Sequence, residues 1–352
     1  MTEFDNINPD HNDYLPKAGQ TEAAQPENDT LHFDGRLNLS KLTEGIAAIR
    51  QEISSVIVGQ HQMTDQLIVA LLSNGHVLIE GVPGVAKTVT VKLLSKALSL
   101  DFSRIQFTPD LMPSDILGTS VFNLSKSDFN FKKGPVFSNF VLIDEINRAP
   151  AKTQAALFEV MEERQITVEG ESHILEAPFL VIATQNPIEQ EGTYRLPEAQ
   201  LDRFLFKINI KYPTLTEEIK ILERENAIKI GDKLDHVNAV INREQILEFQ
   251  ALVKQIVIAP ELLGYIAKIV NNTRENAYLY LGASPRASIA ILNASKGFAA
   301  INGRDFVTPE DIKNAAIPVL RHRVTVAPER EMEGLTGEQI IRQIIDAVEI
   351  PR

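Results

Sequence analysis

The sequence predicts an α/β fold in which a parallel β-sheet is flanked by helices and is followed by an all-helical domain. Between residues 76 and 210, short apolar runs typical of buried strands (HVLIE, SRIQF, FVLIDE, FLVIAT and FLFKINI) alternate with segments of helical periodicity. After Tyr212 and Pro213 the strand patterns stop and helical patterns alone follow. Alternation of this kind is typical of a sheet whose parallel strands are connected by helices.

Composition divides the chain into three segments. Residues 1–36 are predicted to be a disordered acidic tail, because residues 1–30 carry seven acids against one lysine and few apolar side chains. Residues 37–212 are the predicted α/β domain, and residues 213–352 are the predicted helical domain. A chain of 352 residues with 44% hydrophobic composition is long enough and apolar enough for two such domains.

Composition also excludes several kinds of site and partner. The chain has no cysteine, which rules out disulfides, thiolate nucleophiles and cysteine-ligated metals. Its 7 histidines show no ligand spacing, so we expect no metal that the protein holds by itself. The net charge of −12 disfavours nucleic acid as a partner. Because neither a basic leader nor an apolar stretch of about 18 residues occurs, we expect a cytoplasmic protein without membrane insertion.

Two inserts interrupt the alternation of strands and helices, at about 118–137 and 165–177. Both have the alternating pattern of β-hairpins, and the Glu-Gly pair at 169–170 marks the turn of the second. Each insert could be a purely structural edge hairpin or an element that contacts a partner. Phe129, Phe131 and the lysines that follow make the first insert the better candidate for partner contact.

Start signals mark three helices of the predicted second domain. Thr214 with Glu217 forms a capping-box pattern, and Thr308 opens a similar one. Ser284 followed by Pro285 predicts an N-cap with proline at the first helical position. These signals predict helices that begin near 215, 285 and 309.

The segment HVLIEGVPGVAKT predicts a phosphate-binding loop between a strand and a helix. Backbone N–H groups of such a loop and the helix N-terminus attract phosphates, the lysine reaches the β and γ phosphates, and the threonine hydroxyl ligates Mg²⁺. The predicted nucleotide-binding residues are Gly81, Val82, Pro83, Gly84, Val85, Ala86, Lys87 and Thr88. Taken alone, a loop of this composition could also be a tight turn without a ligand.

One position departs from the usual phosphate-loop pattern. Ala86 stands where the pattern G-x-x-x-x-G-K-[ST] has its second glycine. Alanine adds only a methyl group and suits a position that enters a helix, so we expect it to be tolerated.

Two adjacent carboxylates end the apolar run FVLIDE. Asp144, at the predicted strand tip, can hold Mg²⁺ through its water shell. Glu145 can orient or deprotonate an attacking water, because a general base needs above all to be within hydrogen-bond reach. Two acids at a strand end could instead be a solvated edge, but together with the loop they predict a nucleotide hydrolase.

Taken together, the motifs resemble the AAA+ superfamily, and most closely the MoxR-type ATPases. The resemblance covers about residues 37–352 and implies an AAA+ phosphate-loop domain followed by a helical lid. It is carried by IVGQ at 57–60, GVPGVAKT at 81–88, LIDEINRAP at 142–150, VIATQNP at 181–187, LPEAQLDRF at 196–204 and GASPRA at 282–287.

The resemblance assigns roles to further residues around the nucleotide. Asn186 would be the sensor-1 amide that positions the hydrolytic water, although an asparagine before proline is also a common turn residue. The adenine would lie against Val58, Gly59 and Gln60, a segment that could otherwise be a plain turn between helices.

Several arginines resemble groups that act on the phosphates. Arg203 would be the arginine finger that serves ATP bound by the next subunit, unless it makes an ordinary salt bridge with a nearby acid. Arg286 would be the sensor-2 arginine that approaches the phosphates from the lid, with ATP at the junction of the two domains. Arg195 and Arg148 are alternative candidates for the finger and rank below Arg203.

The implied function is Mg²⁺-dependent ATP hydrolysis in a ring, with a homo-hexamer as the expected form. In the family, such ATPases act as chaperone-like factors in enzyme maturation and metal-cofactor insertion, often with proteins that contain a von Willebrand factor A domain. Two alternatives remain: a nucleotide-gated scaffold with little turnover, and a DNA-translocating motor. Intact catalytic residues oppose the first, and the acidic charge opposes the second.

Overall fold

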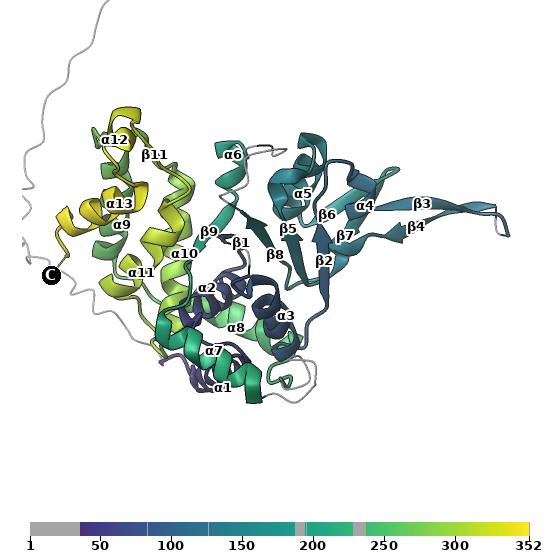
Figure 1. Cartoon of the computed structure of the whole chain (residues 1–352), viewed down its shortest axis with the longest axis horizontal. Coiled ribbons are helices and arrows are strands. Elements are labelled where there is room, and N and C mark those ends of the chain that lie inside the picture. The colour runs from purple at the N-terminus through teal and green to yellow at the C-terminus, as the bar shows by residue number, and fades with distance from the viewer. Residues whose placement is uncertain are drawn as a thin grey trace, which may run out of the picture. The chain divides into compact units, whose positions relative to one another are not determined.

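A parallel sheet forms the centre of the computed structural model (Figure 1). The structure describes residues 36–82, 84–125, 127–186, 194, 196–227 and 237–351. Five strands pair in the order β2-β5-β8-β1-β9, and every pair is parallel. They are β1 (His76–Gly81), β2 (Phe102–Gln106), β5 (Phe140–Asp144), β8 (Leu180–Gln185) and β9 (Phe204–Ile210). These strands contain the apolar runs that the sequence analysis identified, and the predicted α/β class is confirmed.

Helices cover both faces of the sheet, which explains why its strands are apolar throughout. Val77 and Ile79 pack in the core shared with the N-terminal and C-terminal helices, whereas Leu78 between them packs in the core under α5. Successive strand residues point to opposite faces, so a strand buried on both sides needs apolar side chains at consecutive positions. The helices of this part are α1 (Ser40–Val56), α2 (His61–Leu72), α3 (Lys87–Ala97), α4 (Pro113–Leu117), α5 (Ala151–Glu163) and α6 (Glu198–Leu201).

Two antiparallel hairpins lie within the predicted inserts. The first consists of β3 (Gly118–Asn123) and β4 (Asp128–Lys133), and it projects away from the sheet (Figure 1). The second consists of β6 (Gln165–Val168) and β7 (Glu171–Ile174), and both residues of its two-residue turn have positive φ, as a type I′ turn requires. Short 3₁₀ turns at Pro135–Phe137 and Ile146–Arg148 complete this region.

The described residues after Tyr212 form helices, together with one short strand pair that was not predicted. Strands β10 (Leu279–Leu281) and β11 (Thr325–Val326) form a short antiparallel pair, too brief to leave a periodic pattern in the sequence. The helices are α7 (Leu215–Ala227), α8 (Arg243–Gln255), α9 (Pro260–Glu275), α10 (Pro285–Ile301), α11 (Pro309–Leu320), α12 (Pro328–Met332) and α13 (Gly337–Ala347).

Two of the three expected helix caps have their expected bonds. The Thr214 N–H donates to the Glu217 carboxylate at 2.8 Å, and Thr308 forms a capping box with Asp311. Ser284 is the N-cap of α10, but its hydroxyl donates to Asp202 at 3.0 Å rather than bonding to its own helix. This third cap residue therefore ties α10 to the segment before β9.

The first helices after the sheet pack onto the sheet domain. The Arg224 guanidinium on α7 donates to the Ser54 carbonyl at 2.9 Å, and the Gln250 amide on α8 donates to the Leu71 carbonyl at 2.7 Å. Residues Leu37–Arg352 form one compact unit. The change of secondary structure expected at 212 falls inside this unit. No helix in the described part of the chain is long and apolar enough to cross a membrane.

Candidate functional site

The phosphate loop joins the end of β1 to the start of α3. Gly84 has φ +86°, and Ala86 has φ 58° and ψ 22° and is the N-cap of α3. Our reason for expecting Ala86 to be tolerated is therefore wrong, because its backbone is left-handed and not helical. An alanine in this conformation is strained by about 1 to 2 kcal/mol, which a glycine would avoid. Pro83 lies outside the described residues.

Lys87, the first residue of α3, turns back over the loop. Its ammonium donates to the Gly81 carbonyl at 2.7 Å. Burial lowers the pKa of Lys87, and the nearby carboxylates of Asp144, Glu145 and Glu80 oppose that shift. Because the Lys87 ammonium is already partly buried, it can bind an incoming phosphate without further desolvation. Thr88 follows in the first turn of the same helix.

Asp144 ends strand β5 and is buried, with both carboxylate oxygens bonded. The Arg104 Nε on β2 lies 2.6 Å from Oδ2, and the Thr184 hydroxyl on β8 donates to Oδ1 at 3.1 Å. Arg104 comes from one neighbouring strand and Thr184 from the other, so the strand order creates this contact. Neither residue was predicted from the sequence, although Thr184 is a polar side chain near the end of an apolar strand and Arg104 is the central residue of β2.

Glu145 follows in a left-handed conformation, with φ 58° and ψ 51°. Its N–H donates to the Thr184 hydroxyl at 3.1 Å. Its carboxylate Oε2 accepts from the Gln106 amide at 2.9 Å and pairs with the Arg148 Nε at 3.0 Å. Arg148, which we ranked as an alternative finger, thus contacts the carboxylate of its own chain.

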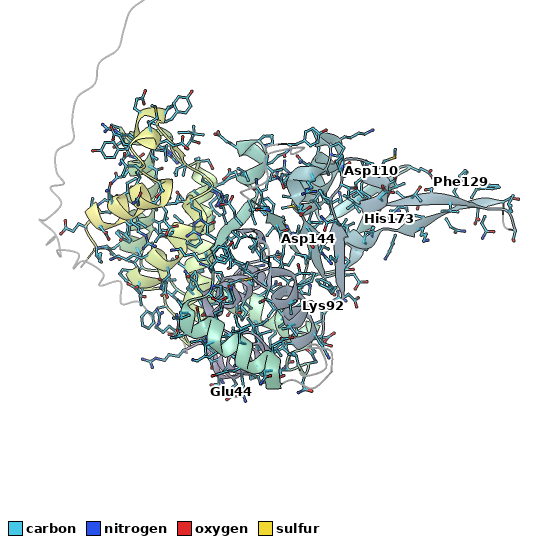
Figure 2. All side chains as sticks on the ribbon, viewed as in Figure 1. Glu44, Lys92, Asp110, Phe129, Asp144 and His173 are labelled. Carbon is cyan, nitrogen blue, oxygen red and sulfur yellow. The ribbon has the colours of Figure 1, made fainter. Side chains whose placement is uncertain are left out.

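Asn186 comes directly after β8, which lies between β5 and β1 in the sheet. The carboxyl ends of parallel strands meet at one edge, so Asn186, Asp144 and the phosphate loop share that edge. Figure 2 shows Asp144 within this central part of the molecule and Phe129 far from it on the β3–β4 hairpin. Three of the predicted elements are therefore brought together.

The donor chemistry at this edge fits a magnesium ion that arrives with a nucleotide. Asp144 Oδ2 already attracts the positive guanidinium of Arg104, and Thr88 supplies a hydroxyl in the first turn of α3. Among the described residues, no group of three histidine or acidic side chains could hold a metal alone. Mg²⁺ usually keeps waters and phosphate oxygens as ligands and needs only one or two protein oxygens.

A pocket of about 600 Å³ contains the residues predicted to contact adenine. Val58, Gly59 and Gln60 line it together with the end of β9. Residue Ile210 of β9 pairs with Gly81, so the pocket is next to the phosphate loop. Helices α11 and α13 line its other side, which places it at the expected junction of sheet and lid.

Arg321, at the end of α11, lines this pocket and was missed by the sequence analysis. Its Nη2 lies 3.0 Å from the Glu338 carboxylate, and its Nε is buried without a bonding partner in the described structure. Burial lowers the pKa of Arg321, and Glu338 opposes that shift. No motif pointed to it, because its place in the pocket depends on how α11 packs on the sheet.

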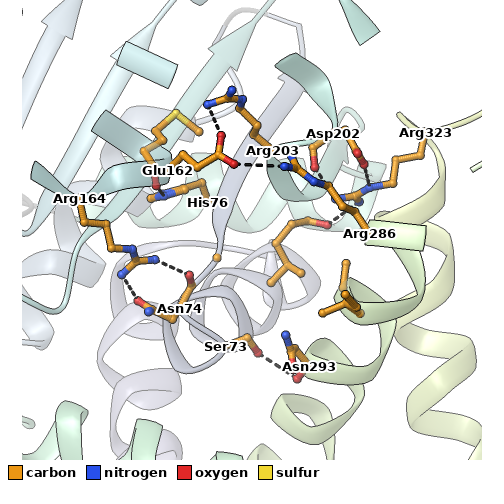
Figure 3. Close-up of a pocket in the computed structure, with 15 residues that line it drawn as sticks. Ser73, Asn74, His76, Glu162, Arg164, Asp202, Arg203, Arg286, Asn293 and Arg323 are labelled. Atoms are coloured by element: carbon orange, nitrogen blue, oxygen red, sulfur yellow. Dashed lines mark hydrogen bonds and ion pairs between the residues drawn. The ribbon is translucent and has the colours of Figure 1, made fainter. Parts of the chain in front are cut away.

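Arg203 and Arg286 lie together at the opposite edge of the sheet. Arg203 precedes β9, whose first residue pairs with His76 at the start of β1. The loop follows the other end of β1, about 16 Å away at about 3.3 Å per residue. Both arginines line a pocket of about 290 Å³ there (Figure 3). Arg286 therefore does not approach the phosphates of its own chain from the lid, in contrast to our expectation.

Glu162, near the end of α5, joins the two arginines. Its Oε2 lies 2.5 Å from Arg203 Nη1, and its Oε1 lies 3.1 Å from Arg286 Nη2 (Figure 3). Arg203 Nη1 also donates to the Phe158 carbonyl at 2.7 Å. The salt bridge that we considered for Arg203 thus exists with a different acid from those near it in the sequence. Arg195 lies outside the described residues.

Behind this pair, Arg323 ties the helical region to the segment before β9. Its side chain is 4% exposed, and its Nε lies 2.6 Å from Asp202 Oδ1. It also donates to the Phe204 carbonyl at 2.7 Å and to the Val319 carbonyl at 2.6 Å. Burial lowers the pKa of Arg323, and Asp202 opposes that shift.

Comparison with known proteins agrees with this geometry. A family model described as "ATPase family associated with various cellular activities (AAA)" matches residues 76–206, and an AAA lid domain model matches residues 271–344. The chain is 42% identical to chaperone MoxR1 of Mycobacterium tuberculosis, over 86% of this chain and 81% of that protein. The chain belongs to the MoxR family of AAA ATPases. It is therefore an ATP hydrolase by family, as the sequence analysis predicted.

The chain is also similar to a second bacterial protein and to a solved structure. The uncharacterized protein YeaC of Bacillus subtilis is 44% identical over 86% of this chain and 93% of its own length. The crystal structure of a candidate ATPase from Cytophaga hutchinsonii superposes with a TM-score of 0.83 at 43% identity, covering 89% of this chain and 97% of that one. The likeness to a solved ATPase thus extends over most of this chain.

Proposed function

We propose that this chain hydrolyses ATP with Mg²⁺ at the interfaces of a homo-hexameric ring in the cytoplasm, and thereby remodels or activates a partner protein. The observation that supports the inter-subunit site is the separation of its parts. Lys87 and the two carboxylates gather at one edge of the sheet, whereas Arg203 and Arg286 lie at the other. An arginine that cannot reach its own phosphate loop can act on ATP bound by a neighbouring copy.

In this proposal each residue at the first edge has one task. Thr88 and Asp144 hold the Mg²⁺ that accompanies ATP, and Lys87 binds the β and γ phosphates. Glu145 activates the attacking water, which Asn186 helps to position. The purine binds in the pocket that Val58, Gly59 and Gln60 line.

The partner in this proposal is a protein and not a nucleic acid. The net charge of −12 repels phosphate backbones. The projecting hairpin carries exposed apolar side chains, among them Phe122 at 47% and Phe129 at 64% exposure, which suit contact with a protein. We further propose chaperone-like maturation or metal-cofactor insertion, with a von Willebrand factor A domain protein as partner, as the family resemblance implies.

The test is Mg²⁺-dependent ATP turnover as a function of protein concentration, for wild type, Glu145→Gln and Arg203→Ala. Specific activity should rise with concentration as the ring assembles, and each change should lower kcat about 100-fold or more while ATP still binds. Glu248→Gln, which alters an exposed acid on α8 away from the phosphate loop and from Arg203, is the matched control and should retain full activity.

Three outcomes would contradict the proposal. Turnover that is independent of concentration, with Arg203→Ala fully active, would mean that each chain completes its own site. ATP binding without turnover at any concentration would favour a nucleotide-gated scaffold, and the search would move to partners that switch it on. A salt-sensitive gain in binding to single-stranded DNA would favour a translocating motor.

A further inference from the structure

Glu162 is a residue of the arginine edge that neither the family motifs nor the proposed function uses. It is 39% exposed and stands in the last turn of α5, outside every motif quoted above. Each of its two carboxylate oxygens contacts a different arginine, one from the segment before β9 and one from the first turn of α10 (Figure 3). One acid thus connects two elements that are 83 residues apart in the chain.

The charges that line the pocket make this acid necessary to the pair. Four arginines and two acids line it: Arg164, Arg203, Arg286, Arg323, Glu162 and Asp202. Asp202 pairs with the buried Arg323, and Arg164 donates to the Asn74 carbonyl at 2.7 Å. Glu162 is therefore the lining acid that remains for Arg203 and Arg286.

Without Glu162, the two guanidiniums would separate. Like charges repel, and Arg286 is 57% exposed, so its long side chain can turn into water at little energetic cost. Arg203 would keep its bond to the Phe158 carbonyl and stay in place. The loss of Glu162 would thus misplace Arg286 relative to Arg203.

The contacts with Glu162 leave donors available for another anion. A guanidinium has five N–H donors, and Glu162 contacts one nitrogen of each arginine. The pair can therefore stay joined to Glu162 while its other donors meet phosphate oxygens. Bidentate contact of this kind is the way in which arginine recognises phosphate.

We propose that Glu162 is a positioning residue that holds Arg203 and Arg286 as one unit for the phosphates bound to the neighbouring subunit. This inference rests on the proposed inter-subunit ATPase. Glu162 does not touch ATP itself. It acts through the two arginines. Its loss should therefore reduce hydrolysis when it occurs in the subunit that supplies the arginines, and not when it occurs in the subunit that binds the nucleotide.

A mixing experiment separates these two subunits. The lending chain carries Glu145→Gln, which stops its own hydrolysis and keeps its arginine pair. The accepting chain carries Arg203→Ala, which keeps its own hydrolytic residues. Neither homo-oligomer should turn over ATP, and an equimolar mixture should recover activity. Sedimentation in the presence of ATP shows that every mixture assembles to the same size.

Glu162→Ala is then added to one chain at a time. In the lending chain we expect kcat of the mixture to fall about ten-fold with little change in KM, because the arginines act mainly on the transition state. In the accepting chain the same change should have no effect. Glu248→Ala in the lending chain is the control, since this exposed acid lies on α8 and lines neither the pocket with Arg203 nor the one beside the phosphate loop, and it should have no effect.

The results distinguish the inference from the function on which it rests. Recovery that Glu162→Ala in the lending chain leaves intact would overturn the inference and leave the inter-subunit ATPase standing. An equal loss from either chain would show a general structural role and would also overturn it. A mixture without recovery, with Glu162 intact in both chains, would refute the inter-subunit site and the inference together.

Discussion

Acid should destabilise the fold through His76, which is buried at the start of β1. Its Nε2 contacts the Met161 carbonyl at 3.0 Å, and its Nδ1 accepts the Val181 N–H at 3.0 Å, so the ring is held neutral. Burial and the charge of Arg164 lower its pKa from 6.5 to about 4, although the bond to Met161 opposes the shift. Between pH 6.5 and about pH 4, the unfolded chain therefore binds a proton at this histidine, whereas the folded chain keeps the ring neutral.

The sign and size of the effect follow from proton linkage. A lowered folded-state pKa gives stability that is present above pH 6.5 and lost as the pH falls toward 4. With these values, His76 removes about 1.4 kcal/mol of unfolding free energy at pH 5.5 and about 0.1 kcal/mol at pH 7.5. The fold should thus lose about 1.3 kcal/mol between these pH values through this residue alone.

Urea unfolding of wild type and His76→Gln at both pH values measures the effect. The variant has an amide at this site and cannot titrate there. Its absolute stability will differ from that of wild type, but the difference between the two chains in pH dependence reports on His76 alone. Buried His322, whose pKa is also lowered by burial, titrates in both chains and cancels in the comparison. If the two chains lose the same free energy between pH 7.5 and 5.5, the reasoning is wrong.

Three further changes test the loop, the carboxylate and the hairpin. Ala86→Gly should raise the unfolding free energy by about 0.5 to 1 kcal/mol, because it relieves left-handed strain; lower stability in urea would contradict this. Gln106→Ala frees one side of Glu145 and should raise basal turnover about five-fold, the equivalent of one hydrogen bond, with an unchanged Kd for ATP; unchanged turnover would contradict it. Gly118→Ala would place a methyl against the Lys132 carbonyl at φ +107°, so amide exchange along β3 should speed up at least about ten-fold; unchanged exchange would show that the hairpin accommodates it.

Local patterns in the sequence were sufficient to predict the sheet and its first edge. The apolar runs are strands because both faces of the sheet are covered, and a strand buried on two sides has no room for polar positions. The loop before Lys87 follows one strand directly, and the acids at 144–145 stand at the end of another. Since parallel strands end at a common edge, their meeting could be inferred without knowing the strand order.

Contacts between distant elements could not be predicted in this way. Arg104 reaches Asp144 because β2 pairs with β5, a fact that depends on strand order. Glu162 is 41 residues from Arg203, and the sequence offers closer acids as partners. The left-handed conformation of Ala86 was also missed. The phosphate-loop pattern states that glycine usually stands at this position, but it does not state which backbone conformation the position needs.

Helix α11 connects the two edges of the subunit. Lys313 and Ile317 on it line the pocket beside the phosphate loop, and Arg321 at its end lines that pocket too. Two residues later, Arg323 grips the segment that carries Arg203, through a buried ion pair whose rupture costs about 3 to 5 kcal/mol. In the ring that we propose, a shift of this helix when ATP enters or leaves the pocket would therefore be transmitted to the opposite edge. Helix α11 would thus couple the occupancy of the nucleotide pocket to the position of Arg203. In the proposed ring, this coupling would pass the state of one nucleotide to the next site.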